Sequence, residues 1–316
     1  MYKTLSTAAA LGLMALPALA SGVTVDNCGT PLTFDQTPER IVVHDINMTE
    51  MAFALGLQDR MVGVTGITGW YKTTPTFDED RGDIPELAEK YPTVENLVAA
   101  DPDMFFAGWY YGMRPGGEVT PDTLAPLGIQ TLVLSESCVH QHEGRPEATM
   151  DLLFGDMMRL GKIMDVEDRA AELVDGWQAQ LADLEALTDG VERPRVFLLD
   201  GPADAPFTSG KFAIVDAMIT AAGGASVTHD MDTSWGRSSW EAVAASNPEF
   251  LVLLDYAEGQ SAKDTFAYLQ EHPVMQFTDA VQNGRWVGLA YEELTPGPAN
   301  IDAIDKMARA MHPDLF

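Results

Sequence analysis

Large aromatic side chains recur in this 316-residue sequence just beyond the apolar segments that are typical of strands. Flat side chains of this kind suit a bulky ligand that is partly aromatic or macrocyclic. Aromatic residues make up only 9% of the chain, so their concentration in a few segments marks a candidate binding site, although several are expected simply to pack beneath their own loops. The candidates are Trp70, Tyr71, Trp109, Tyr110, Tyr111, Phe207, Trp235, Tyr256 and Tyr291.

Basic side chains fall in the same segments, namely Lys72, Arg114, Lys211 and Arg237. The whole chain holds 19 Lys and Arg against 48 Asp and Glu, a formal net charge of -29, so these cations stand out. Guanidinium and ammonium groups beside aromatic rings favour an anionic ligand. Arg114 and Arg237 are the best candidates, and the alternative is that each cation neutralises a local acid such as Glu118 or Asp232.

A short histidine cluster is the one local pattern that could bind a metal ion. His140 and His142 have a spacing that suits two ligands on one extended segment, and His44 and His229 could join them from other loops. The alternative is that His140 and His142 are solvated or contact an organic ligand. We expect no resident metal ion, with these two histidines as the only candidates.

Patterns of catalytic residues are missing from the sequence. It has no Gly-x-Ser-x-Gly elbow, no glycine-rich phosphate loop and no His-Glu-x-x-His helix. Ser209 and Lys211 lie close together, but without the strand and helix that position a nucleophile. We therefore expect a binding protein rather than an enzyme, with no cofactor of its own. The negative charge excludes a nucleic-acid partner, because phosphate binding needs a basic surface.

The first 20 residues have the layout of a secretory signal peptide. Lys3 supplies the positive start, residues 8–16 form an apolar run, and Ala18-Leu19-Ala20 fits the small-x-small cleavage rule. A membrane anchor would need roughly 20 apolar residues. We therefore expect residues 1–20 to be removed on export to the periplasm.

Two cysteines, Cys28 and Cys138, are present in this exported chain. An oxidising compartment allows them to form one disulfide. Lipid modification of Cys28 is an alternative, but Val25-Asp26-Asn27 before it is not the small apolar run that such signals use. A zinc or redox role is less favoured because there is no Cys-x-x-Cys pair. We predict the disulfide.

Short apolar segments alternate with helical ones, which indicates an α/β fold with mostly parallel sheets. Residues 165–188 differ, because apolar side chains recur there every three or four positions, as on one face of a long helix that Asp165 could cap. We predict an N-terminal lobe at residues 21–164 and a C-terminal lobe at 189–316, bridged by this helix. The strand-like segments are residues 40–44, 61–66, 104–108, 131–134, 195–199, 250–254 and 285–289.

One segment occurs twice in altered form, at residues 94–103 and 240–249. Each copy has a glutamate, Glu95 or Glu241, then apolar residues, a proline, an acid and a strand. Proline forces the chain out of a short helix, so both copies predict helix, turn and strand. An acid near a helix start is also what capping favours. The repeat indicates that the two lobes are built alike.

Together these features resemble the periplasmic solute-binding proteins of ferric-siderophore and cobalamin ABC importers, the class with a single-helix hinge. The resemblance covers essentially the whole chain after the signal. Its markers are unspecific one by one, but their order and spacing are specific. They are Thr37-Pro38-Glu39-Arg40, Thr49-Glu50, Asp101-Pro102-Asp103, Leu160-Gly161-Lys162, Gly223-Gly224, Asn247-Pro248-Glu249 and His312-Pro313-Asp314-Leu315-Phe316.

The resemblance implies a ligand cleft between the lobes, at the carboxyl ends of the strands. It also implies that Glu95 and Glu241 dock onto arginines of the two permease subunits, so that a pseudo-symmetric protein meets a symmetric dimer. The expected function is capture of an iron chelate, a ferric siderophore, by a monomer that delivers it to the permease. Cobalamin or heme is the alternative, and binding of a bare metal ion is less favoured.

Overall fold

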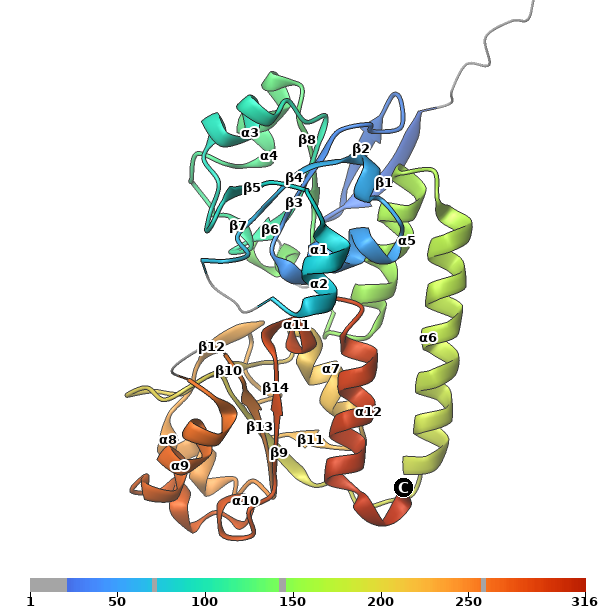
Figure 1. Ribbon diagram of the computed structural model, residues 1–316. Helices are drawn as coiled ribbons and strands as arrows, with labels where there is room; N and C mark the ends of the chain where they lie inside the picture. Colours follow the sequence, from blue (N-terminus) through green and yellow to red (C-terminus); the bar gives the residue numbers. More distant parts are fainter. Residues whose placement is uncertain (1–21, 70–72, 142–145, 257–259) are drawn as a thin grey trace, which may run out of the picture.

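The computed structural model describes residues 22–69, 73–141, 146–256 and 260–316 (Figure 1). The predicted signal peptide lies outside these ranges. The chain folds into two α/β lobes, each built on a parallel sheet, and helix α6 (Glu167–Thr188) runs beside both. The two-lobed α/β fold predicted from the sequence is confirmed. Within the described ranges, no helix combines the length and the apolar character needed to cross a bilayer.

The sheet of the N-terminal lobe has strand order β5-β4-β3-β6, and β8 and the short β7 both pair with β6. Every residue of β3 and β6 is buried, because near-continuous apolar runs suit strands that helices cover on both faces. The strands are β3 (Ile41–His44), β4 (Met61–Thr65), β5 (Glu86–Ala88), β6 (Met104–Trp109), β7 (Gly112–Met113) and β8 (Gln130–Val133). The helices are α1 (Ile46–Ala54), η1 (Gln58–Arg60), α2 (Pro75–Arg81), α3 (Val94–Ala100), α4 (Pro121–Leu124), η2 (Ala125–Leu127), η3 (Ser135–His140) and α5 (Asp151–Ile163).

The sheet of the C-terminal lobe has the parallel order β11-β9-β13-β14, and a separate antiparallel pair, β10 with β12, stands beside it. The strands are β9 (Arg195–Leu199), β10 (Phe207–Ser209), β11 (Ala225–Ser226), β12 (Trp235–Arg237), β13 (Phe250–Leu254) and β14 (Trp286–Leu289). The helices are α7 (Ile214–Ala221), α8 (Trp240–Ala245), α9 (Ala262–Glu271), η4 (Met275–Phe277), α10 (Asp279–Gln282), α11 (Tyr291–Leu294), α12 (Asn300–Met311) and η5 (Pro313–Leu315).

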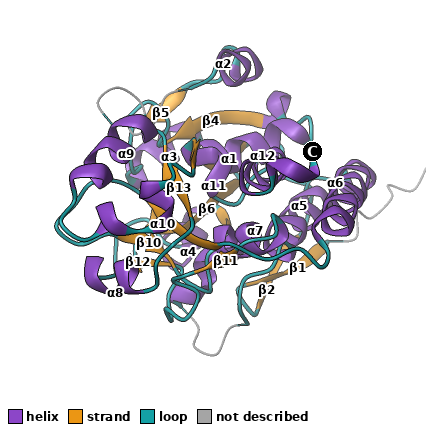
Figure 2. Ribbon diagram, turned by 90° about the horizontal axis from the view of Figure 1, so that it is seen from below, coloured by secondary structure: helices purple, strands orange, loops and turns teal. Residues whose placement is uncertain are grey.

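Helix α6 packs on α5 at its start and on α7 and α12 further along, and Figure 2 shows α5 and α6 side by side. At about 1.5 Å per residue its 22 residues span about 33 Å, enough to reach both lobes. A Cβ on Gly161 of α5 would lie 2.5 Å from the Cβ of Ala170, so glycine lets the two helices approach closely. The predicted cap is wrong, because Asp165 adopts a left-handed φ of 58° in the turn and Val166 holds the N-cap position.

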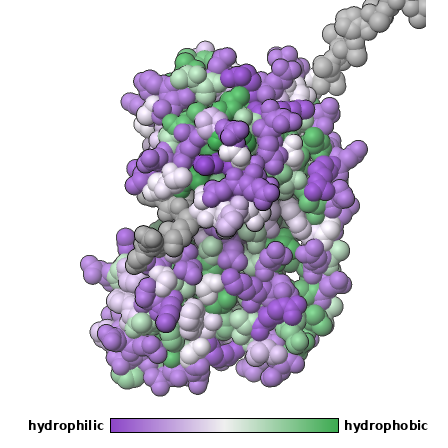
Figure 3. All heavy atoms as spheres, viewed as in Figure 1, coloured by the Kyte–Doolittle hydropathy of each residue, from purple (hydrophilic) through white to green (hydrophobic). Residues whose placement is uncertain are grey.

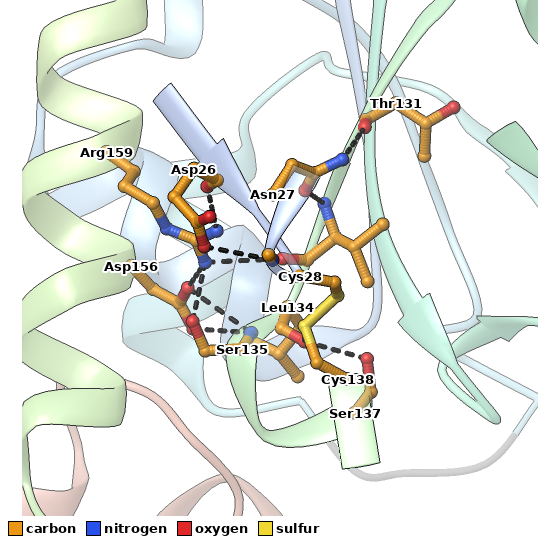
Figure 4. Close-up of polar contacts among 12 residues, drawn as sticks. Asp26, Asn27, Cys28, Thr131, Leu134, Ser135, Ser137, Cys138, Asp156 and Arg159 are labelled. Atoms are coloured by element: carbon orange, nitrogen blue, oxygen red, sulfur yellow. Dashed lines mark hydrogen bonds and ion pairs between the residues drawn. A yellow bond between two sulfur atoms is a disulfide. The ribbon is translucent and has the colours of Figure 1, made fainter. Parts of the chain in front are cut away.

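The predicted disulfide is confirmed and fixes a hairpin to the N-terminal lobe (Figure 4). Strands β1 (Val23–Asn27) and β2 (Thr30–Phe34) form the hairpin, and Cys28 at its turn bonds to Cys138 in η3, with 5.3 Å between the Cα atoms. The Asn27 side chain extends β8 by donating to Thr131 O (3.1 Å) and accepting from Val133 N (2.8 Å). Arg159 of α5 adds a hydrogen bond to Asp26 O at 2.8 Å.

The repeated segment has the same structure in both lobes, as the sequence predicted. Helices α3 and α8 each begin after a hydroxyl N-cap and end before a residue with positive φ, Asp101 (49°) or Asn247 (46°). In each lobe an arginine from an earlier part of the chain binds this turn. Arg40, just before β3, donates from Nε to Asp101 O (2.6 Å), and Arg195, the first residue of β9, donates from Nε to Asn247 O (2.9 Å). Strands β3 and β9 pair with β6 and β13, the strands that follow the two turns. The two lobes therefore share a turn as well as a strand pattern.

Candidate ligand-binding cleft

A cavity of about 500 Å³ lies between the lobes and is lined by residues from both of them. Its N-terminal wall comes from the turn after β6 and from η3, and its C-terminal wall from the ends of β9 and β13, the β10–β12 pair and α11. Most of these positions follow the carboxyl ends of parallel strands, where open α/β lobes bind ligands. The lining residues are Tyr110, Tyr111, His140, Asp200, Phe207, Ser234, Trp235, Leu254, Tyr256, Tyr291 and Thr295.

Aromatic side chains dominate this lining. The rings of Phe207 and Trp235 stack with centroids 6.0 Å apart, on the paired strands β10 and β12. Across the cavity, Tyr110 meets His140 edge to face at 4.7 Å. Six of the aromatic candidates from the sequence are brought together here: Tyr110, Tyr111, Phe207, Trp235, Tyr256 and Tyr291. Such walls suit a large, flat ligand.

Trp109 does not line this cavity. Trp109 is 8% exposed and packs in the core of the N-terminal lobe with Phe105 and Cys138, because it is the last residue of the buried strand β6. It is therefore a core residue. Trp70 and Tyr71 lie outside the described residues.

Of the basic candidates, Arg114, Lys211 and Arg237 do not line the cavity, contrary to the charge argument made from the sequence. Arg114 lies over the ring of Tyr91, 4.7 Å from its centroid. Arg237 donates to Ala205 O at 2.9 Å. Lys211 pairs with Asp232 at 2.9 Å, as the alternative of local neutralisation supposed. Lys72 lies outside the described residues. Within the part of the lining that the structure describes, there is no Lys or Arg.

Asp200 is the acidic residue of the lining, and the sequence analysis did not single it out. Tyr256 Oη donates to Asp200 Oδ1 at 2.6 Å. Burial raises the pKa of Asp200, and burial together with Asp200 raises the pKa of Tyr256, which stays a phenol. Burial lowers the pKa of His140, so its imidazole is neutral at pH 7. Ser234, Leu254 and Thr295 were also missed, because no composition signal marks them.

The histidines proposed to meet in a metal site have separate partners. His44 Nδ1 lies 2.8 Å from Thr65 Oγ1, and burial lowers the pKa of His44 to about 3. His229 bonds to Asp216 at 2.8 Å. His142 lies outside the described residues, and those that are described contain no group of three or more His, Cys, Asp or Glu placed to hold a metal ion.

Glu95 and Glu241 occupy matching places in the two lobes. Each is an exposed residue in the first turn of its short helix, α3 or α8. Both helices lie on the side of the molecule away from α6 in the two ribbon views (Figures 1 and 2).

The chain belongs to the periplasmic binding protein family, whose model matches residues 41–291. This family is the class of two-lobed binding proteins that the sequence resembles.

Three known proteins show the extent of the similarity. An uncharacterized ABC transporter substrate-binding lipoprotein, YvrC of Bacillus subtilis, is 21% identical, covering 93% of this chain and 87% of its own. A cobalamin-binding protein of Halobacterium salinarum is 25% identical, covering 91% and 73%. The crystal structure from an ABC-type Fe³⁺-hydroxamate transport system of Saccharomonospora viridis superposes with a TM-score of 0.76 at 24% identity, covering 91% and 98%.

Proposed function

We propose that this chain is the substrate-binding component of an ABC importer and captures a bulky metal chelate that carries little negative charge, with a corrinoid such as cobalamin as first candidate. The observation that carries this proposal is the cavity between the lobes, where six aromatic side chains meet and the described lining holds no Lys or Arg. Large aromatic walls bind flat macrocycles, and a lining whose described part holds no cation offers no counterion there for a strongly anionic ligand. The similarity to a cobalamin-binding protein supports the same choice.

A ferric siderophore, the ligand expected from the basic residues, fits this cavity only in its weakly charged forms. A ferric tris-catecholate is strongly anionic, but Arg114 and Arg237 contact Tyr91 and Ala205 and are not among the described lining residues. Ferric hydroxamates carry little charge, so they are the second candidate. Heme is less favoured because its two propionates need basic partners.

The proposed docking to the permease rests on the resemblance to this family. Glu95 and Glu241, exposed on matching helices, are proposed to dock onto basic residues of the permease dimer. Residues 1–20 are proposed to direct export to the periplasm as a cleaved signal peptide, and the mature chain, with lobes at 21–164 and 189–316, to act as a monomer.

Tryptophan fluorescence tests which ligand the cavity binds, since Trp235 lies in the cavity wall. The chain is titrated with cyanocobalamin, a neutral ferric tris-hydroxamate, a ferric tris-catecholate, heme and Zn²⁺. We expect saturable quenching by cyanocobalamin, or by the tris-hydroxamate if the second candidate is correct. Quenching by the tris-catecholate or by Zn²⁺ alone would overturn the proposal. Turnover of any of these compounds would show that the chain is an enzyme and not a binding protein.

A further inference from the structure

A smaller aromatic pocket lies on the C-terminal lobe, apart from the cavity between the lobes. Its volume is about 400 Å³, and it is formed by the start of α8, the end of α9 and the segment between β9 and β10. Helices α8 and α9 lie on the side of the molecule away from α6 (Figures 1 and 2). The lining includes Ala203, Asp204, Trp240, Tyr268, Glu271 and His272.

Three aromatic rings of this pocket contact one another. The ring of Trp240 lies 4.4 Å from that of His272 and 6.1 Å from that of Tyr268, measured between centroids. Trp240 Nε1 donates to Ala203 O at 3.1 Å, and Tyr268 Oη donates to the same carbonyl at 3.5 Å. The protein itself holds the rings in place, so a side chain that binds against them does not have to order them.

The rings differ in how far they are buried. Trp240 is 6% exposed and also contacts the core ring of Phe197 at 6.4 Å, whereas Tyr268 and His272 are half-buried. Val94 takes the place of Trp240 in the N-terminal copy of the repeated segment, so the repeat does not require an aromatic residue there. Tyr268 and His272 keep part of their surface exposed in the pocket.

The charge around these rings is negative. Asp204, Glu271 and Glu241 are exposed, and none of them makes an ion pair with a residue that the structure describes. Burial and then Asp204 raise the pKa of Tyr268, and Glu241 opposes the burial that lowers the pKa of His272, so both carboxylates act on the rings. The His272 imidazole is therefore neutral at pH 7, and the described lining holds no Lys or Arg. A cation in this pocket would meet carboxylates and no opposing charge.

We propose that this pocket, together with Glu241, is a socket for one arginine side chain of the permease. This role rests on the proposed function and specifies how the C-terminal lobe docks. A guanidinium stacks on aromatic faces and pairs with carboxylates through a planar fork, whereas the ammonium of lysine is a compact, strongly hydrated charge. Tryptophan, tyrosine and arginine are also enriched among the residues that carry most of the binding energy of an interface. Glu241 follows Trp240 in α8, so the pocket is continuous with the docking surface already proposed.

Binding to the importer's permease dimer in lipid nanodiscs, measured by surface plasmon resonance, tests the socket. Tyr268→Leu removes one ring and is expected to raise the Kd about tenfold, whereas Tyr268→Phe keeps the ring and is expected to bind like the wild type. Asp204→Asn/Glu271→Gln is expected to raise the Kd about fivefold and to weaken its dependence on salt. The matched control is Asp175→Asn/Asp183→Asn, which removes two exposed carboxylates of α6 and is expected to leave the Kd unchanged.

A double-mutant cycle identifies the side chain that occupies the socket. Each arginine and each lysine on the periplasmic side of the permease is replaced by alanine and tested with the wild-type chain and with Tyr268→Leu. We expect one arginine whose replacement and Tyr268→Leu together raise the Kd by less than the product of their separate effects. Coupling to a lysine alone, or to no basic residue, would overturn the inference.

A parallel ligand titration separates docking from folding and from capture of the ligand. Each variant is expected to bind the ligand like the wild type, because the pocket shares no described lining residue with the cavity between the lobes. Should Tyr268→Leu fail to fold, the exposed pair Asp204→Asn/Glu271→Gln tests the socket by itself. Wild-type affinity of that pair for the permease would overturn the inference alone. A wild-type chain that does not bind the permease would overturn the proposed function as well.

Discussion

Burial of carboxyl groups is the main electrostatic feature at the residue scale. Glu136 and Asp45 are each 3% exposed and hydrogen-bonded between the lobes, and burial raises the pKa of both to about 7. Glu50 on α1 has a pKa raised to about 8, by burial first and then by Glu292, and its Oε2 is buried without a hydrogen-bond partner among the described residues. These groups bind protons in the folded chain that they release on unfolding near neutral pH.

Stability is therefore expected to fall as the pH rises. A carboxyl whose folded pKa is raised above its unfolded value of about 4.3 binds more protons in the folded state, so the free energy of unfolding falls between about pH 4.5 and 8. For Glu50 the slope is at most about 1.4 kcal/mol per pH unit. Glu50→Gln is expected to flatten the decline seen by urea denaturation from pH 5 to pH 8.

The control for this prediction is Glu118→Gln, which removes an exposed carboxylate and is expected to leave the pH dependence unchanged. A Glu50→Gln variant whose unfolding free energy declines with pH as steeply as that of the wild type would contradict the assignment.

The aromatic residues of the candidate site are predictable from the sequence, and its buried acidic residues are not. Tyr110, Tyr256 and Tyr291 follow strands that can be recognised from their apolar runs, so the carboxyl-end rule places them at the cleft. Asp200, Asp45 and Glu136 are three of 48 acids, and only tertiary packing distinguishes a buried carboxyl from a solvated one. Arg114, Arg237 and Lys211 were misplaced for the same reason, since local partners engage them.

At the scale of elements, two features stabilise the N-terminal lobe. Helix α5 packs against α6, and a disulfide bonds the β1–β2 hairpin to the lobe. The apolar period of α6 predicts its length well, because a helix with one buried face must repeat every three or four residues. Its start was misjudged at Asp165, because the tight turn from α5 depends on close packing at Gly161 and Ala170. The hairpin is fixed by Cys28–Cys138 and by Asn27 at the edge of β8.

Removal of the disulfide is expected to destabilise the chain by about 2–5 kcal/mol, since it closes a loop with a sequence separation of 110 residues. Urea denaturation of Cys28→Ser/Cys138→Ser under non-reducing conditions gives the loss in the free energy of unfolding. Wild-type chain treated with a reductant is the matched comparison and is expected to match the variant. Equal stability of the oxidised wild type and the variant would show that the bond does not stabilise the lobe.

The whole molecule presents a largely hydrophilic face on both lobes (Figure 3), in keeping with its net charge of -29. The shared turn at Asp101 and Asn247 shows that the lobes repeat one design, with Glu95 and Glu241 at equivalent positions. A pair of equivalent acidic groups suits a partner with two equivalent basic sites. The sequence predicts this repeat because both copies keep glutamate and proline at the same spacing.

Glu95→Ala/Glu241→Ala is expected to reduce transport by the reconstituted importer to background and to leave ligand affinity unchanged. Both side chains are exposed and lie outside the described cavity lining, so their loss removes only the charges that are proposed to dock. Uptake of radiolabelled ligand and a parallel binding titration measure the two effects. A loss of ligand affinity, or normal uptake, would contradict the docking role.

A crystal structure of the chain with cyanocobalamin tests the central claim most directly. We predict the corrin ring between Tyr110 and Tyr111 on one lobe and the stacked Phe207 and Trp235 on the other. A corrinoid bound elsewhere, for example in the cavity of about 510 Å³ beside α6 that Asp216 and His229 line, would contradict the claim.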